Sequence, residues 1–187
     1  RLMDMEIYSI VDYAINKCTS DVAVYIFEQL SETKQFVVLT YKYFVALLEN
    51  KNFSAESKKK IISVASGFNI NEKTKETFVS SYLCNIKDTA ENRKILIPYL
   101  VSLVDTLPTN SVEKYLLDCV GDKEYKPEVV RIIFETKINK SFFRDTFDKY
   151  IVSGKDDPEV KNQIFNVLAE AGLYVSEGAC ISFALGN

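Results

Sequence analysis

The sequence predicts an all-α protein, and three observations carry that prediction. Apolar residues recur at helical spacing along almost the whole chain, and the alternation typical of strands is nearly absent. Gly, Pro, Ser, Asp and Asn interrupt this pattern at short intervals, as they do at helix ends. The segment 127–134 returns at 158–165 with five of its eight positions identical. Such self-similarity, at a period of about 20 to 50 residues, is typical of stacked helical units.

The N-terminal third of the chain predicts three helical segments. The first spans 4–17, and Thr19-Ser20 separates it from a second helix. The segment 34–49 is apolar on nearly every side, so we expect it to lie between neighbours at the centre of the fold. A buried β segment at 36–39 is the alternative there. The buried stripe expected for the second helix comprises Val22, Ile26, Phe27 and Leu30.

Capping signals divide the middle of the chain. A helix over 55–66 should end at Gly67, and Asn69 with Glu72 has the spacing of a capping box before the next helix. Asp88 and Glu91 repeat that spacing before a further apolar run. Pro98 lies inside this run and should kink or split its helix. A short helix that starts at Asn110 or Ser111 should then be closed by Gly121.

The C-terminal part predicts helices over 127–136, 141–152 and 158–171, the last one stopped by Gly172. A further helix is expected after Ser176, although Gly178 weakens it. The chain therefore predicts ten or eleven helices joined by short connections, which make successive helices antiparallel neighbours.

Pairing these helices in order gives about five hairpins, and a looser copy of the repeated segment begins at Val22, three units of about 36 residues before Val129. A hairpin with one apolar face must bury it against another hairpin. The expected architecture is thus an α-solenoid of the helical-hairpin type (HEAT, ARM or TPR-like), and a compact non-repeating multihelical domain is the alternative. We expect residues 1–187 to form a single domain, cut from a longer protein because position 1 is not Met.

Composition narrows the functional classes. The 187 residues are 47% hydrophobic and 26% charged, as in ordinary globular proteins, and no apolar run is long enough for a membrane span. The net charge of −3 makes nucleic acid an unlikely partner. Four scattered cysteines predict reduced thiols and a cytoplasmic or nuclear protein: Cys18, Cys84, Cys119 and Cys180.

The residue types needed for catalysis are largely missing. The chain has no histidine, which is the commonest general base and metal ligand. Its cysteines do not have the spacing of a zinc site, and its six glycines form no phosphate-binding loop. The pairs Asp156-Asp157 and Asp122 with Glu124 are interpreted as helix caps. We therefore expect no enzyme, no catalytic residue, no cofactor and no metal.

Two sets of side chains are candidates for a recognition surface. Lys58-Lys59-Lys60 is the best basic patch, and we expect its three lysines to spread around the exposed side of one helix. The patch is extended by Lys51, Lys73 and Lys75. Five tyrosines are expected to be core or half-buried residues rather than a binding surface: Tyr8, Tyr13, Tyr25, Tyr41 and Tyr43.

The sequence therefore predicts a non-enzymatic protein–protein interaction module, a scaffold or adaptor segment that binds another protein or peptide. The binding residues stay unknown at this level. An RNA-binding helical repeat is the alternative, and an enzyme completed by parts outside this chain is a third.

Overall fold

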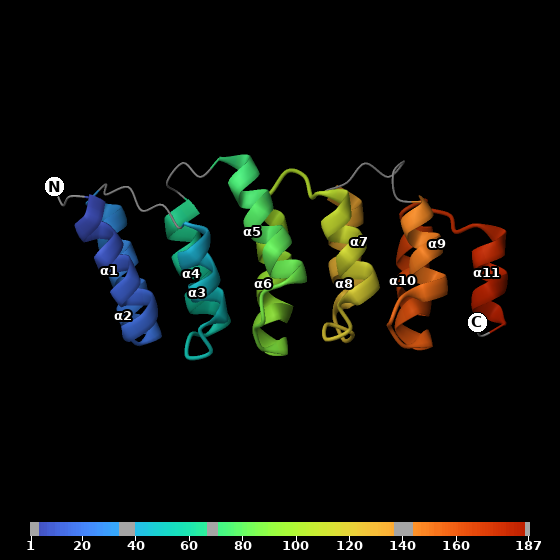
Figure 1. Cartoon of the computed structure of the whole chain (residues 1–187), viewed down its shortest axis with the longest axis horizontal. Coiled ribbons are helices and arrows are strands. Elements are labelled where there is room, and N and C mark those ends of the chain that lie inside the picture. The colour runs from blue at the N-terminus through green and yellow to red at the C-terminus, as the bar shows by residue number, and fades with distance from the viewer. Residues whose placement is uncertain (1–3, 34–39, 67–70, 137–143, 186–187) are drawn as a thin grey trace. The chain divides into compact units, whose positions relative to one another are not determined.

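The protein is all-helical. The computed structural model describes residues 4–33, 40–66, 71–136 and 144–185, which form eleven helices and no strand (Figure 1). The helices are α1 (Asp4–Lys17), α2 (Ser20–Glu32), α3 (Tyr41–Glu49), α4 (Ala55–Ser66), α5 (Glu72–Cys84), α6 (Ala90–Ser102), α7 (Thr109–Asp118), α8 (Lys126–Thr136), α9 (Arg144–Ser153), α10 (Pro158–Glu170) and α11 (Glu177–Ala184).

Most of the expected helices are confirmed, and α1 and α4 have the predicted bounds. The described part of the central segment is helical over Tyr41–Glu49, and residues 34–39, with the β alternative at 36–39, lie outside the described residues. Gly172 adopts a φ of 76° just after α10, where a left-handed residue commonly ends a helix. Gly121 has no such role, because α7 already ends at Asp118.

Two predicted caps were misplaced by one or two residues. Asn71 caps α5, and its side chain accepts a hydrogen bond from the Thr74 backbone N–H at 2.9 Å; Asn69 lies outside the described residues. At α6, the Thr89 hydroxyl accepts from the Asn92 N–H at 3.2 Å. This leaves the neighbouring Asp88 side chain available for another role.

Of the two outcomes predicted for Pro98, a kink or a split, the split does not occur, since α6 continues through it to Ser102. Proline removes one backbone hydrogen bond, the one to the carbonyl of Lys94. Lys94 is exposed, so water can hydrate that carbonyl and the helix survives the loss.

The described residues cluster into two compact units, Arg1–Tyr99 and Leu100–Asn187. Within the first unit, the odd-numbered helices are neighbours in chain order, α1 with α3 and α3 with α5, and α2 packs on α4. The second unit has the same arrangement: α7 packs on α9, α9 on α11, and α8 on α10. In each unit, therefore, the first helix of a hairpin packs on the first helix of the next hairpin, and a second helix packs on a second helix.

The buried stripe of α2 differs from the predicted one at its start. Ala23, Phe27 and Leu30 are buried, whereas Val22 is 48% exposed. Phe27 and Leu30 were predicted correctly, Ile26 is half-buried, and Ala23 takes the place predicted for Val22. Because Val129 is buried, Val22 is not its equivalent, and the loose early copy of the repeated segment does not hold.

A recurring contact links the two helices of four successive hairpins. A basic side chain near the start of the second helix donates to the backbone carbonyl ten residues earlier, near the end of the first helix. The pairs are Lys58 with Leu48, Arg93 with Leu83, Lys126 with Leu116, and Lys161 with Ile151. Carbonyls in the last turn of a helix lack intrahelical partners, and cations are favoured at that end of the dipole.

These contacts recur at spacings of 35, 33 and 35 residues. The eight-residue match between 127–134 and 158–165 has a spacing of 31 and is therefore out of register with them. It places Phe134, which is buried, on Phe165, which is half-buried. That match relates the starts of α8 and α10 and does not give the period of the hairpins.

In each unit, one of these lysines also makes a buried ion pair with the next hairpin. The Lys58 cluster consists of Lys58, Leu48, Tyr82 and Asp88, in which the ammonium lies 2.8 Å from Asp88. Both charged side chains are fully buried, and the aspartate lies thirty residues after the lysine.

The Lys126 cluster repeats this arrangement in the second unit with Lys126, Leu116, Tyr150 and Asp156. Its aspartate again follows the lysine by thirty residues, and the tyrosine hydroxyl again donates to the aspartate oxygen that the ammonium contacts.

Candidate interaction groove

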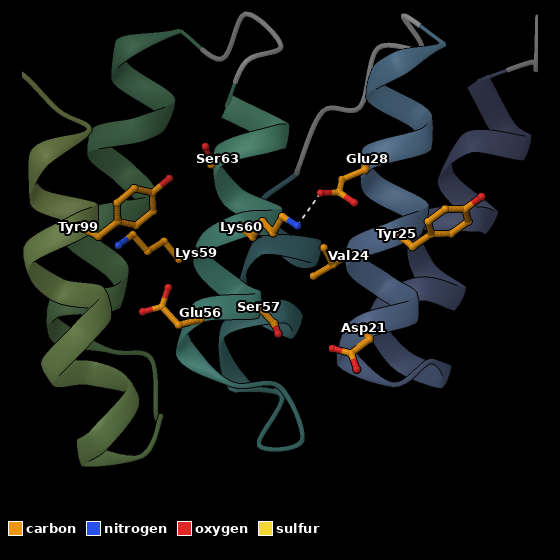
Figure 2. Close-up of a pocket in the computed structure, with 10 residues that line it drawn as sticks. All are labelled: Asp21, Val24, Tyr25, Glu28, Glu56, Ser57, Lys59, Lys60, Ser63 and Tyr99. Atoms are coloured by element: carbon orange, nitrogen blue, oxygen red, sulfur yellow. Dashed lines mark ion pairs between the residues drawn. The ribbon is translucent and has the colours of Figure 1, made fainter.

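The first unit contains an open groove of about 600 Å³ over α2, α4 and α6. Its walls therefore come from the second helix of three successive hairpins (Figure 2). The lining residues are Asp21, Val24, Tyr25, Glu28, Glu56, Ser57, Lys59, Lys60, Ser63 and Tyr99.

An ion pair crosses the groove between α4 and α2. The Lys60 ammonium lies 2.7 Å from a Glu28 carboxylate oxygen, and Figure 2 shows the two side chains pointing toward each other. Their side chains are 58% and 35% exposed. Exposed pairs of this kind contribute about 0 to 1 kcal/mol, so a ligand can replace the pair at little cost.

On the other side of α4, Lys59 lies over the ring of Tyr99 in α6, with the ammonium 5.3 Å from the ring centroid. Burial raises the pKa of the Tyr99 hydroxyl above its ordinary value, and a hydrogen bond with Ser63 partly offsets this rise. Tyr99 is thus a neutral, hydrogen-bonded aromatic wall of the groove.

The remaining charges in the groove are acidic. Among the described residues, Asp21 and Glu56 form neither an ion pair nor a side-chain hydrogen bond. Tyr25 lies one helical turn after Asp21 on α2, is 60% exposed, and stands at the rim in Figure 2. The groove therefore presents two free carboxylates and an accessible aromatic ring.

The lysine run does not form the exposed patch that the sequence predicted. Lys58 is fully buried in the Lys58 cluster, Lys59 lies on Tyr99, and Lys60 is paired with Glu28. The three side chains do point apart around α4, but one of those directions is into the core. The other lysines of the predicted patch, Lys51, Lys73 and Lys75, do not line the groove.

The tyrosine prediction was wrong for four of its five residues. Tyr8, Tyr13, Tyr25 and Tyr41 are 41% to 60% exposed, and only Tyr43 is half-buried. Tyr8 stacks on Tyr43 with ring centroids 6.2 Å apart. Tyrosine reaches the surface from the edge of an apolar stripe because its hydroxyl prefers water.

The acidic pairs are also corrected. Asp157 is the N-cap residue of α10, as predicted, although its side chain makes no cap hydrogen bond. Asp156 is a buried partner of Lys126, not a cap. Asp122 is likewise buried and accepts the Tyr125 hydroxyl, while Glu124 is exposed.

The described residues contain no group of histidine, cysteine or carboxylate side chains arranged to hold a metal ion. The four cysteines are free thiols and half-buried. No helix among the described residues has the length and apolar character needed to cross a membrane.

Comparison with protein-family models, with curated proteins and with solved structures found no match to this chain.

Proposed function

We propose that this chain is a non-enzymatic interaction segment of the α-solenoid type that binds another protein. The contacts between equivalent helices of successive hairpins support the stacked architecture. The contact between a basic side chain and the carbonyl ten residues earlier, repeated in four hairpins, supports it independently. Stacked hairpins present a continuous surface formed by one helix from each.

The observation that carries the binding proposal is the groove over α2, α4 and α6. An extended segment of a partner protein fits an open groove of this kind better than a small molecule does, since small-molecule sites enclose most of their ligand. The free carboxylates of Asp21 and Glu56 favour lysine or arginine in that segment, and Tyr25 offers a ring for a cation–π contact.

The alternative of an RNA-binding repeat gains no support from the lysine run. Lys58 is buried, Lys60 is paired with Glu28, and the groove lining carries three carboxylates against two lysines, which disfavours phosphate.

A library of random linear 15-residue peptides displayed on phage tests the proposal against the immobilised chain. We expect enriched peptides to be rich in Lys or Arg. The double variant Asp21→Lys/Glu56→Lys should weaken their binding at least about tenfold, or about 1.4 kcal/mol, in fluorescence anisotropy.

The matched control is Glu159→Lys/Glu91→Lys, which reverses two acidic residues in the first turns of α10 and α6, outside the groove. This control should bind like the unmodified chain. Equal loss in both double variants, or the absence of any enriched peptide, would overturn the proposal.

A further inference from the structure

The part of the groove between α2 and α4, called here the α2–α4 furrow, carries charges that alternate in sign along the helices. The helix α2 packs on α4, and the groove lining between them includes Asp21 and Glu28 of α2 and Lys60 of α4. In Figure 2, Asp21 lies toward the start of α2, Glu28 lies toward its end, and Lys60 lies between these two heights. A negative, a positive and a negative group therefore follow one another along the furrow.

The same order does not exist across the helices. Asp21 and Glu56 are each the second residue of their helix, so the start of the groove is negative on both α2 and α4. Lys59 and Lys60 come about one turn later on α4 and make the next level positive. A segment lying across the helices would meet charges of one sign, whereas a segment lying along them meets both signs in turn.

The ion pair in the furrow can be exchanged for pairs with a ligand. Lys60 and Glu28 lie 2.7 Å apart with side chains that are 58% and 35% exposed, and such pairs contribute little. A wholly basic segment would bring a like charge to Lys60, which is unfavourable. A segment with an acidic group opposite Lys60 and basic groups opposite Asp21 and Glu28 forms three pairs in place of one.

The spacing of the furrow charges suits an extended segment. Asp21 and Glu28 are seven residues apart on α2, which corresponds to a rise of about 10 Å. Side chains at alternate positions of an extended chain line one face and recur about every 6.6 Å, so the first and fifth residues are about 13 Å apart. The flexible stem of a lysine side chain can take up the difference of about 3 Å.

We propose that the α2–α4 furrow selects an extended partner segment of the pattern basic-x-acidic-x-basic. The acidic side chain pairs with Lys60 in place of Glu28, and the two basic side chains pair with Asp21 and Glu28. This inference rests on the proposed function, because it names the partner chemistry of the same groove. It goes beyond a preference for basic peptides, since it requires a carboxylate at the central position.

A phage-displayed library of 11-residue peptides tests the pattern. Three alternate central positions are each Lys or Glu, which gives eight sign patterns, and all other positions are Ser, Thr or Gly. Multivalent display makes weak binding measurable. On the immobilised unmodified chain, we expect Lys-x-Glu-x-Lys to be enriched at least about fivefold over Lys-x-Lys-x-Lys.

Charge reversal in the furrow should change the selected pattern in a defined way. On Lys60→Glu, Lys-x-Lys-x-Lys should become the most enriched pattern, because the central charge now faces a carboxylate. On Glu28→Lys, one of the two outer positions should change to Glu, and the position that changes reports the direction of the bound segment. Lys94→Glu, at an exposed lysine of α6 outside the groove, is the matched control and should keep Lys-x-Glu-x-Lys.

The possible outcomes separate this inference from the proposed function. Enrichment of Lys-x-Lys-x-Lys on the unmodified chain, or the same preferred pattern on Lys60→Glu as on the unmodified chain, would overturn the inference and leave a groove for basic segments. Enrichment of no sign pattern at all would overturn both.

Discussion

Each of the two units buries one lysine ammonium group, and the groups that surround it differ between the units. In both, the lysine donates to a helix-terminal carbonyl ten residues earlier and pairs with an aspartate thirty residues later. In both, a tyrosine hydroxyl donates to the same aspartate oxygen as the ammonium. Burial lowers the pKa of each lysine, and the aspartate partly offsets this.

The aspartates differ in how fully they are hydrogen-bonded. The second oxygen of Asp88 accepts from the Thr89 N–H at 2.8 Å and from the Asn92 amide at 2.9 Å. The second oxygen of Asp156 is buried and has no hydrogen-bond partner among the described residues. Asn92 and Val160 occupy the same position, the third residue of α6 and of α10.

The lysines differ in the opposite sense. Lys126 lies over the rings of both Tyr115 and Tyr150, with centroids 5.6 and 5.5 Å from the ammonium, and also donates to the Cys119 carbonyl. At the place of Tyr115, the first unit has Leu47, since each lies just before the residue whose carbonyl accepts from the lysine. The ion pair is therefore common to both units. The first unit adds hydrogen bonds to the aspartate, whereas the second adds contacts to the lysine.

Removal of the aspartates should have the largest effect on the free energy of unfolding, and the effect should differ between the two units. Asp88→Ala leaves a buried ammonium unpaired and is expected to cost about 3–5 kcal/mol of unfolding free energy. It also removes one hydrogen-bond acceptor from each of three further donors, whereas Asp156→Ala removes one only from the Tyr150 hydroxyl in addition to the ammonium. Asp156→Ala should therefore cost less, by about 1 kcal/mol or more. Urea unfolding measures both.

The double variants Lys58→Met/Asp88→Leu and Lys126→Met/Asp156→Leu serve as controls. Because an apolar replacement removes both the charges and their desolvation, each double variant should be clearly more stable than its aspartate-to-alanine single variant. A cost below about 1 kcal/mol for Asp88→Ala would show that its ammonium is not dependent on the carboxylate.

Exchanging the third residue between α6 and α10 should change the free energy of unfolding by an intermediate amount. Asn92→Val removes the amide from Asp88 and is expected to cost about 1–3 kcal/mol. Val160→Asn offers an amide to the unpaired oxygen of Asp156 and should cost much less, or stabilise the protein by about 1 kcal/mol. Equal destabilisation by the two substitutions in urea unfolding would mean that the two aspartates are equally satisfied.

The smallest effect concerns alkaline pH in the second unit. Burial raises the pKa of Tyr150 above its ordinary value of 10.0, and the charge of Asp156 and the hydrogen bond with it add to this rise. Above pH 10 the unfolded chain releases the phenolic proton while the folded chain keeps it, so stability falls as pH rises, by at most about 1.4 kcal/mol per pH unit. Tyr150→Phe should show a shallower loss between pH 9 and 11.

The buried lysines act with the opposite sign in the same range. Their folded pKa lies below that of the unfolded chain, so the unfolded chain binds more protons up to about pH 10.5 and stability rises with pH. Subtracting the Tyr150→Phe profile from that of the unmodified chain removes this contribution. Tyr174→Phe, at an exposed tyrosine, should give the unmodified profile.

The helices were predictable from sequence because apolar periodicity and capping residues are local. The start of α4 could be read from Ser54 and the apolar run after it, whereas Gly67, its predicted stop, lies outside the described residues. The burial of Lys58 could not be read in this way. A run of three lysines indicates a solvated face, and only the fold brings Asp88 to the ammonium of Lys58.

A signal for the clusters nevertheless existed in the sequence. The pattern of a lysine, a tyrosine 24 residues later and an aspartate six residues after that occurs at Lys58 and at Lys126. It also occurs at Lys75, with Tyr99 and Asp105, although Lys75 pairs with Glu72 instead. The spacing of these polar residues is not reflected in the apolar pattern, whose best match has a spacing of 31 residues. The groove could not be predicted because its side chains come from three helices that are brought together only by the fold.

The thirty-residue ion pairs have a mechanical consequence. Each one fastens the second helix of one hairpin to the turn of the next, in a place that water does not reach. Tension along the chain cannot separate those hairpins gradually, because the pair has no partially hydrated arrangement to pass through. Under an applied pulling force, we expect the hairpins joined by each ion pair to resist extension up to a threshold force and then to separate in one step.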